Sequence, residues 1–249
     1  MSYPTLRLHP RKEESVLRFH PWIFSGAIAS FSAPVEDGDL VSVVDSKGRP
    51  LGTGHFGGGS IAVRLLSFDA EEVIDRAFYK RRLEAALRLR LSCDLVRPVG
   101  SSDSPNTTFR LVHGEGDSLP GLIIDIYDRT AVVQAHSLGM HQARQTIAEV
   151  LWEVFAEAGD PVLPLEGVYY KSETTLPTRD MRELTSDGFL IGHTEAAPIY
   201  ENGVRFTPDW LKGQKTGFFI DQRDNRALVA HYAKGRTVLN AFCRSEERR

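Results

Sequence analysis

The chain has 249 residues, of which 41% are hydrophobic and 25% charged, with a formal net charge of −3. This length suffices for one large domain or for two to three small ones, and the overall charge gives no general signal for nucleic acid or membrane binding. The average hides a division, because the net charge is +2 over residues 1–99, −9 over residues 100–200 and +4 over residues 201–249. Such a distribution permits RNA binding without proving it.

Two cysteines, Cys93 and Cys243, provide neither a disulfide framework nor a zinc set, which fits a reducing compartment. No apolar stretch approaches the roughly eighteen residues of a membrane span, and the start MSYPTLRLHP lacks the apolar run of a signal peptide. We therefore expect a cytoplasmic protein. We expect Cys93 to be structural in its Leu-rich helical context, and Cys243 to be a packing residue because no histidine lies near it in the sequence.

Residues 1–69 consist of short apolar runs separated by Gly, Pro and Asp, which predicts a small β-barrel or curled sheet. Two of the expected strands are residues 40–45 and 61–66. The run Gly57–Ser60 is expected to form a turn of this barrel. It is not a P-loop, because it lacks the lysine and the following helix.

Residues 70–99 are interpreted as a connecting helix and linker. Apolar residues recur at helical spacing from Ala70 to about Leu95, and Glu71 and Glu72 lie near the expected start, where the helix dipole favours acids. Basic residues crowd this helix, and we favour a solvated face over RNA contact. These residues are Lys80, Arg81, Arg82, Arg88 and Arg90.

Residues 100–204 are predicted to form a central α+β domain. The expected strands cover residues 109–113, 122–127, 130–135 and 168–171, and a helix is expected from about Met140 to Glu157. Between the first two strands lies HGEGD, for which we favour a hairpin loop over a metal or acid–base site. The histidines show no metal-ligand spacing, so we expect no metal. No GxSxG motif is present, so nothing indicates a serine hydrolase.

Residues 205–249 contain the most informative stretch, GQKTGFFIDQRDNR at positions 213–226. Residues 215–219 are expected to be extended and to form one side of a flat pocket. Asp221 or Asp224 is expected to cap a helix that runs through Tyr232 and ends at Gly235. Gln222 and Arg223 would then lie in its first turn and converge with free N–H groups on an anionic or polar ligand. A capped helix with a solvated arginine is the alternative, and physical grounds alone favour it.

This stretch, followed by a helix and VLNAFC at 238–243, closely resembles the rRNA large-subunit methyltransferase I family. Three other stretches resemble the family pattern in the same order: residues 18–28; residues 54–56 with 61–66; and residues 110–117 with 119–122. The resemblance covers residues 1–243. It implies an S-adenosylmethionine-dependent RNA (cytosine-C5) methyltransferase acting on 23S ribosomal RNA.

The resemblance also implies an N-terminal PUA-like RNA-binding barrel, a central α/β domain and a C-terminal Rossmann-like methyltransferase domain. Expected RNA contacts are Arg18, His20, Trp22 and Arg64. For Trp22 alone, a core position is the better expectation. Expected contacts to S-adenosyl-L-methionine are Lys215, Thr216, Phe218, Phe219, Asp221, Gln222 and Arg223.

The strand expected at residues 237–243 resembles the first strand of the methyltransferase domain, and only the start of that domain is expected here. The glycine-rich turn, the acidic residue for the ribose and the catalytic cysteine of the family have no counterpart after Arg244, so neither cysteine is assigned as nucleophile. We expect residues 236–249 to be disordered, non-natively packed or aggregation-prone, because their apolar side chains lack neighbouring strands.

Two other interpretations remain open. One is a catalytically inactive RNA-binding module built from the barrel and the central domain, and the other is a related methyltransferase acting on guanine N7. The expected partner is ribosomal RNA. The sequence does not fix the oligomeric state and leaves a homodimer open.

Overall fold

The computed structural model describes residues 3–101, 103–176 and 186–239. Contacts within the chain define two compact units, the first through Phe218 and the second from Phe219 on.

The N-terminal part of the first unit is a six-stranded curled sheet with strand order β2-β6-β5-β4-β1-β3. Its elements are β1 (Thr5–Leu8), α1 (Glu14–Leu17), β2 (Trp22–Phe24), η1 (Ser25–Ala27), β3 (Ile28–Phe31), β4 (Leu40–Val44), β5 (Pro50–Phe56) and β6 (Ile61–Ser67). Its buried core includes Leu6, Val41, Val63 and Leu65. This confirms the predicted barrel or curled sheet, the two predicted strands and the turn at residues 57–60.

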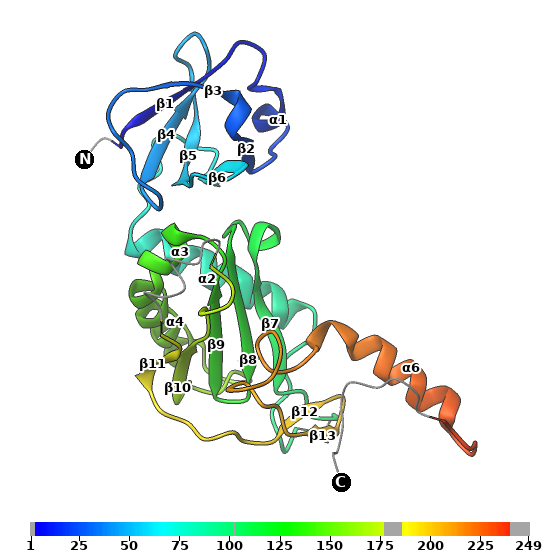
Figure 1. Cartoon of the computed structure of the whole chain (residues 1–249). Coiled ribbons are helices and arrows are strands. Elements are labelled where there is room, and N and C mark those ends of the chain that lie inside the picture. Colours follow the sequence, from blue (N-terminus) through cyan, green and yellow to red (C-terminus); the bar gives the residue numbers. More distant parts are fainter. Residues whose placement is uncertain (1–2, 102, 177–185, 240–249) are drawn as a thin grey trace. The chain divides into compact units, whose positions relative to one another are not determined.

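The central part is a five-stranded sheet with strand order β11-β10-β9-β8-β7 (Figure 1). The strands are β7 (Thr108–His113), β8 (Leu122–Tyr127), β9 (Thr130–Ala135), β10 (Gly167–Tyr170) and β11 (Gly188–Gly192). β9 and β10 are parallel and the other pairs antiparallel. The parallel pair needs a long crossover, which α3 (Leu138–Gln142) and α4 (Arg144–Ala158) supply. The predicted α+β unit is confirmed.

One face of this sheet is apolar and the other carries polar side chains, because alternate residues of a strand point to opposite faces. Leu122, Ile124 and Ile126 of β8 belong to a large core that also contains residues of α4 and of α2 (Arg76–Ser92). The opposite face carries Asp125, whose partner across the ladder to β7 is Arg110. Figure 1 shows α2 and α4 beside the sheet.

The predicted bounds of both helices need correction. α2 begins at Arg76 and not near Ala70, because the Asp75 carboxylate accepts a hydrogen bond from the Phe78 amide and caps the helix there. Glu71 therefore precedes the helix. The second predicted helix is two helices that meet at Ala143.

The basic side chains of α2 are paired with acids rather than forming only a solvated face. Lys80 bonds to Glu153 and Glu157 of α4, and Arg81 bonds to Glu72. Arg90 is nearly buried and forms a two-bond ion pair with Asp117.

A small hairpin of β12 (Ile199–Glu201) and β13 (Val204–Phe206) completes the strands of the first unit. The second unit contains η3 (Ile220–Gln222) and α6 (Arg223–Ala233). The helix is followed by Gly235 in the left-handed conformation (φ 70°), as predicted. Residues 237–239 form no strand, and Val238 and Leu239 are exposed. The rest of the strand predicted at 237–243, including Cys243, lies outside the described residues.

The barrel and the central part meet where the His55 ring of β5 packs against Gly139 of α3. His55 is buried, and its Nδ1 atom has no hydrogen-bond partner among the described residues. Burial, and after it the charge of Arg64, lowers the pKa of His55 to about 4. The neutral imidazole is therefore the form that this junction accommodates.

Gly139→Ala tests how closely the junction is packed. An added Cβ would lie 2.2 Å from Cγ of His55. We expect a loss of about 1–3 kcal/mol in the free energy of unfolding, measured in urea, despite the better helix propensity of alanine. Gly57→Ala is the control, since its Cβ would meet no atom within 4 Å. Equal stability of the two variants would show that the junction is loose.

The junction should also be sensitive to acid. The ordinary pKa of a histidine is 6.5 and that of folded His55 is about 4, so between these values the unfolded chain binds a proton that the folded chain does not. The contribution of His55 to the free energy of unfolding is fully present above pH 6.5. It falls by about 3 kcal/mol as the pH falls toward 4. Urea unfolding from pH 7 to pH 4 should show this extra loss relative to His55→Gln. Parallel stability curves for the two proteins would contradict it.

Candidate functional site

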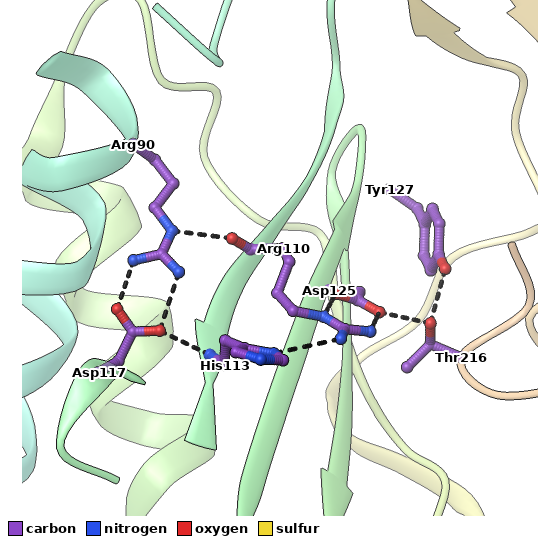
Figure 2. A network of polar contacts seen from close by, with 7 residues as sticks. All are labelled: Arg90, Arg110, His113, Asp117, Asp125, Tyr127 and Thr216. Carbon is purple, nitrogen blue, oxygen red and sulfur yellow. Dashed lines mark hydrogen bonds and ion pairs between the residues drawn. The ribbon is translucent and has the colours of Figure 1, made fainter. Parts of the chain in front are cut away.

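The polar face of the central sheet is organised around the Asp125 carboxylate, which is completely buried. Arg110 donates two hydrogen bonds to it, Nε to Oδ1 at 2.8 Å and Nη2 to Oδ2 at 3.0 Å. The Thr216 hydroxyl donates a third bond to Oδ2 at 2.5 Å. Figure 2 shows these contacts. A buried charge needs such compensation, because its desolvation is costly.

The hydroxyl of Tyr127 extends this network by one step. Its oxygen lies 2.8 Å from the Thr216 hydroxyl. Since threonine has a single hydroxyl proton and donates it to Asp125, Tyr127 donates to Thr216. Burial, together with the charge of Asp125, raises the pKa of Tyr127, which keeps the phenol protonated for this role.

Thr216 belongs to a tight loop and not to the extended piece predicted for residues 215–219. Lys215 and Gly217 have φ values of 55° and 121°. A Cβ on Gly217 would lie 2.4 Å from Cα of Trp210, and one on Gly213 would lie 2.2 Å from the Asp209 carbonyl oxygen. Both positions therefore require glycine, which explains the GxxxG spacing of this loop.

Three further side chains, Lys171, Gln134 and Trp210, anchor residues 209–217, here called the anchored loop, to the sheet. Lys171, directly after β10, donates from Nζ to the carbonyl oxygens of Trp210 (2.8 Å) and Gly213 (2.7 Å). Gln134 of β9 donates to the Lys215 carbonyl at 3.2 Å. The Trp210 ring packs against Tyr169 and Phe189. Burial lowers the pKa of Lys171, and the charges of Asp187 and Asp209 oppose that shift.

The HGEGD segment forms the hairpin loop that was predicted, with η2 (Gly114–Asp117) between β7 and β8. Asp117 accepts the His113 amide at 2.6 Å and pairs with Arg90 of α2. Arg90 also donates to the Arg110 carbonyl oxygen at 2.9 Å (Figure 2). Asp117 therefore positions the hairpin against α2.

A pocket of about 390 Å³ lies between this hairpin, the sheet, the barrel and the anchored loop. Its lining comprises Arg64, Arg110, Gly114, Glu115, Gly121, Leu122, Ile123, Gln134, His136 and Lys215. Two residues predicted as ligand contacts, Arg64 and Lys215, thus contribute to one cavity. Partial burial lowers the pKa of Arg64, and the charge of Glu115 opposes this shift.

The four predicted RNA contacts occupy different positions on the barrel. Trp22 and Arg64 are cross-strand partners on β2 and β6, and the His20 ring packs edge-on against Trp22. Arg18 is exposed at the end of α1. The expectation that Trp22 is a core residue is wrong: its ring is half-buried, and its Nε1 donates to Glu115 at 2.7 Å.

The seven predicted cofactor contacts are divided between the two units. Lys215, Thr216 and Phe218 belong to the first, where Phe218 packs against Phe206 at 5.0 Å between ring centroids. The second unit contains Phe219, Asp221, Gln222 and Arg223.

Two other expectations were wrong. Neither predicted aspartate caps α6: Gln222 occupies the N-cap position without a side-chain cap bond, because η3 leads directly into the helix. Cys93 is exposed at the C-terminal end of α2 and is not a packing residue.

The residues that hold the anchored loop were not among the predicted site residues; they are Asp125, Tyr127, Gln134, Lys171 and Trp210. An acidic residue inside the otherwise apolar strand 122–127 was the available signal, since a buried charge requires a partner.

Two features are absent from the described ranges. No helix there is long and apolar enough to cross a lipid bilayer. No group of three or more His, Cys, Asp or Glu side chains in the same ranges is arranged to hold a metal ion.

Comparisons with known proteins place this geometry in context. A PUA-like domain model matches residues 6–68. The ribosomal RNA large subunit methyltransferase I of Shewanella amazonensis is 39% identical over 241 residues, which are 96% of this chain and 57% of the relative. The Alteromonas mediterranea protein of the same name is 38% identical over 94% of this chain and 56% of the relative.

The chain is a homologue of ribosomal RNA large subunit methyltransferase I. It spans somewhat more than half the length of these methyltransferase I relatives.

Two solved structures share the fold. A candidate SAM-dependent methyltransferase from Streptococcus mutans aligns with a TM-score of 0.72 at 19% identity, over 94% of this chain and 55% of its own. SMU.776, a candidate methyltransferase crystallised with SAH, aligns with a TM-score of 0.70 at 20% identity, over 91% of this chain and 52% of its own.

Thr216→Val tests the anchoring of the loop. The change removes one donor from the buried Asp125 carboxylate and the acceptor of Tyr127. We expect the free energy of unfolding in urea to fall by about 1–3 kcal/mol, and amide exchange at residues 213–217 to accelerate. Thr216→Ser keeps the hydroxyl and is the control. If both variants behave alike, the hydroxyl does not anchor the loop.

Proposed function

We propose that this chain contributes RNA recognition and one wall of the S-adenosylmethionine site to an enzyme that methylates cytosine C5 in 23S ribosomal RNA. The observation that carries the proposal is the identity of 39% with a ribosomal RNA large subunit methyltransferase over 96% of the chain. The anchored loop supports it, because its contacts hold residues 213–217 of the 213–226 stretch on the central sheet.

The cofactor wall is proposed to run from Lys215 to Arg223. Phe218 offers an aromatic face to an adenine ring, and Lys215 offers a cation to a carboxylate, so these side chains fit the cofactor chemically. Thr216 is buried and its hydroxyl is engaged by Asp125 and Tyr127, so we assign it a positioning role. Phe219, Asp221, Gln222 and Arg223, which follow in the sequence, are also proposed as cofactor contacts.

S-adenosylmethionine, when bound, supplies the methyl group. The residues of this chain bind and orient: Lys215 and Phe218 would hold the cofactor. Arg18, His20, Trp22 and Arg64 of the barrel would hold RNA through phosphate contact and stacking. The target base has to be unstacked before it can be reached. We assign the nucleophile to none of the described residues.

The same proposal divides the chain into a PUA-like barrel (1–69), a helix and linker (70–99), a central domain (100–204) and the cofactor-wall segment (205–249). The packing of α2 into the core of the central sheet favours counting residues 76–92 with that domain. Cytoplasmic location and a homodimer remain predictions.

Isothermal titration of the chain with S-adenosylmethionine tests the cofactor wall. We expect a micromolar dissociation constant that rises about tenfold in Gln222→Ala, the loss of about one hydrogen bond. Gln145→Ala, on the exposed side of α4, is the control. RNA binding without cofactor binding would favour an RNA-binding module instead.

Nucleoside analysis of 23S ribosomal RNA from cells with and without the gene tests the reaction. Loss of one 5-methylcytidine is expected. Loss of 7-methylguanosine would identify the guanine N7 alternative, and an unchanged profile would contradict the proposal.

A further inference from the structure

We propose that the junction between the barrel and the central sheet holds two neighbouring nucleotides of unpaired RNA, with the phosphate between them on Arg64. This inference rests on the proposed function. It specifies the form of RNA that the chain recognises and the place on the chain where that RNA binds.

Two pockets meet at Arg64. The first is the pocket of about 390 Å³ described above, and the second, of about 410 Å³, is lined mainly by the barrel. The second lining comprises Asp37, His55, Phe56, Gly57, Gly58, Gly59, Ser60, Ile61, Arg64, Ser137 and Leu138. Both volumes lie in the range of about 300–1,000 Å³ that is typical of small-ligand sites. His136 of the first pocket precedes Ser137 of the second, so the two follow one another around the arginine.

Arg64 has the properties of a phosphate ligand. Its side chain is half-buried, and among the described residues its guanidinium makes no hydrogen bond or ion pair. The carboxylate of Glu115 is close enough for its negative charge to act on the guanidinium. A guanidinium presents five N–H donors in a planar fork that matches two phosphate oxygens. An arginine with unused donors between two cavities suits a phosphate that joins two nucleosides.

The chemistry of the two pockets suits nucleosides on either side of that phosphate. The first pocket presents Gln134, His136 and Glu115, which together offer hydrogen-bond donors and acceptors to a base edge. Lys215 adds a second cation there.

The second pocket presents the aromatic ring of Phe56 and the side chains of Ser60 and Ser137. Its glycine loop leaves room, since a Cβ on Gly57 or Gly59 would meet nothing within 4 Å. An unstacked base can stack on such a ring and form hydrogen bonds with the neighbouring hydroxyl groups.

The form of the RNA follows from this geometry. Bases in an A-form duplex are stacked and paired, and the major groove is too deep and narrow for side chains to read, whereas unpaired bases can be splayed into pockets. Two separate cavities joined at one cation therefore fit a single strand and not a duplex.

Fluorescence anisotropy with a labelled single-stranded fragment of 23S ribosomal RNA, and with the same fragment annealed to its complement, tests the inference on the full chain. We expect the single strand to bind at least about tenfold more tightly. Arg64→Ala should weaken binding about tenfold and lower the slope of log K against log salt by about 0.7, the value for one phosphate contact on a single strand.

Matched variants separate recognition from folding. Arg64→Lys keeps the charge without the fork and should restore only part of the affinity. His136→Ala should weaken binding by removing a contact in the first pocket, and Ser60→Trp by filling the second. Arg88→Ala, an exposed arginine of α2 beside Glu84, should bind like the wild type. Thermal unfolding of each variant confirms that it is folded.

The outcomes distinguish this inference from the function on which it rests. Equal affinity for duplex and single strand, or an unchanged affinity and salt slope in folded Arg64→Ala, overturns the inference and leaves the proposed function standing. If the wild-type chain binds no ribosomal RNA at all, both are overturned.

Discussion

The buried carboxylate of Asp125 is the constraint on which the candidate site depends. It lies on the polar face of a sheet whose other face is packed by helices, so its charge is compensated only by what reaches that face. Arg110 from the neighbouring strand and Thr216 from a loop 91 residues along the chain provide the compensation. Releasing the loop would leave the carboxylate short of a donor, which is costly in a buried position. The requirement of one strand thus fixes the place of residues 213–217.

The barrel also meets the central part of the chain through polar side chains. His55 is kept neutral against Gly139, Trp22 donates to Glu115 of the β7–β8 hairpin, and Arg64 lines two pockets from the edge of the barrel. The junction therefore contains polar side chains whose hydrogen-bonding atoms are only partly paired within the described residues. A surface of this kind suits a partner that brings both charge and hydrogen-bonding edges, as RNA does.

Local sequence patterns predicted the parts of the fold that depend on local residues. Strands at residues 40–45, 61–66, 122–127 and 130–135 are confirmed, since continuous or alternating apolar residues specify them. The predicted start of α2 was too early, because the apolar pattern continues upstream of Asp75. The capping bond of Asp75 sets the actual first residue of the helix.

The site was less predictable, because its geometry comes from contacts distant in sequence. The loop around Thr216 was expected to be extended, and nothing within residues 213–219 announces that Asp125, Gln134 and Lys171 hold it. The resemblance located the segment, whereas its conformation required the tertiary structure. Trp22 shows the same limit: the residue type suggested a core position, and its partner Glu115 lies 93 residues away.

A double-mutant cycle between Asp125→Asn and Thr216→Val, measured by urea unfolding, tests the central constraint most directly. The account predicts a coupling energy of about 1–3 kcal/mol, because each change removes the same buried interaction. Additive effects, with a coupling near zero, would show that the carboxylate does not hold the loop.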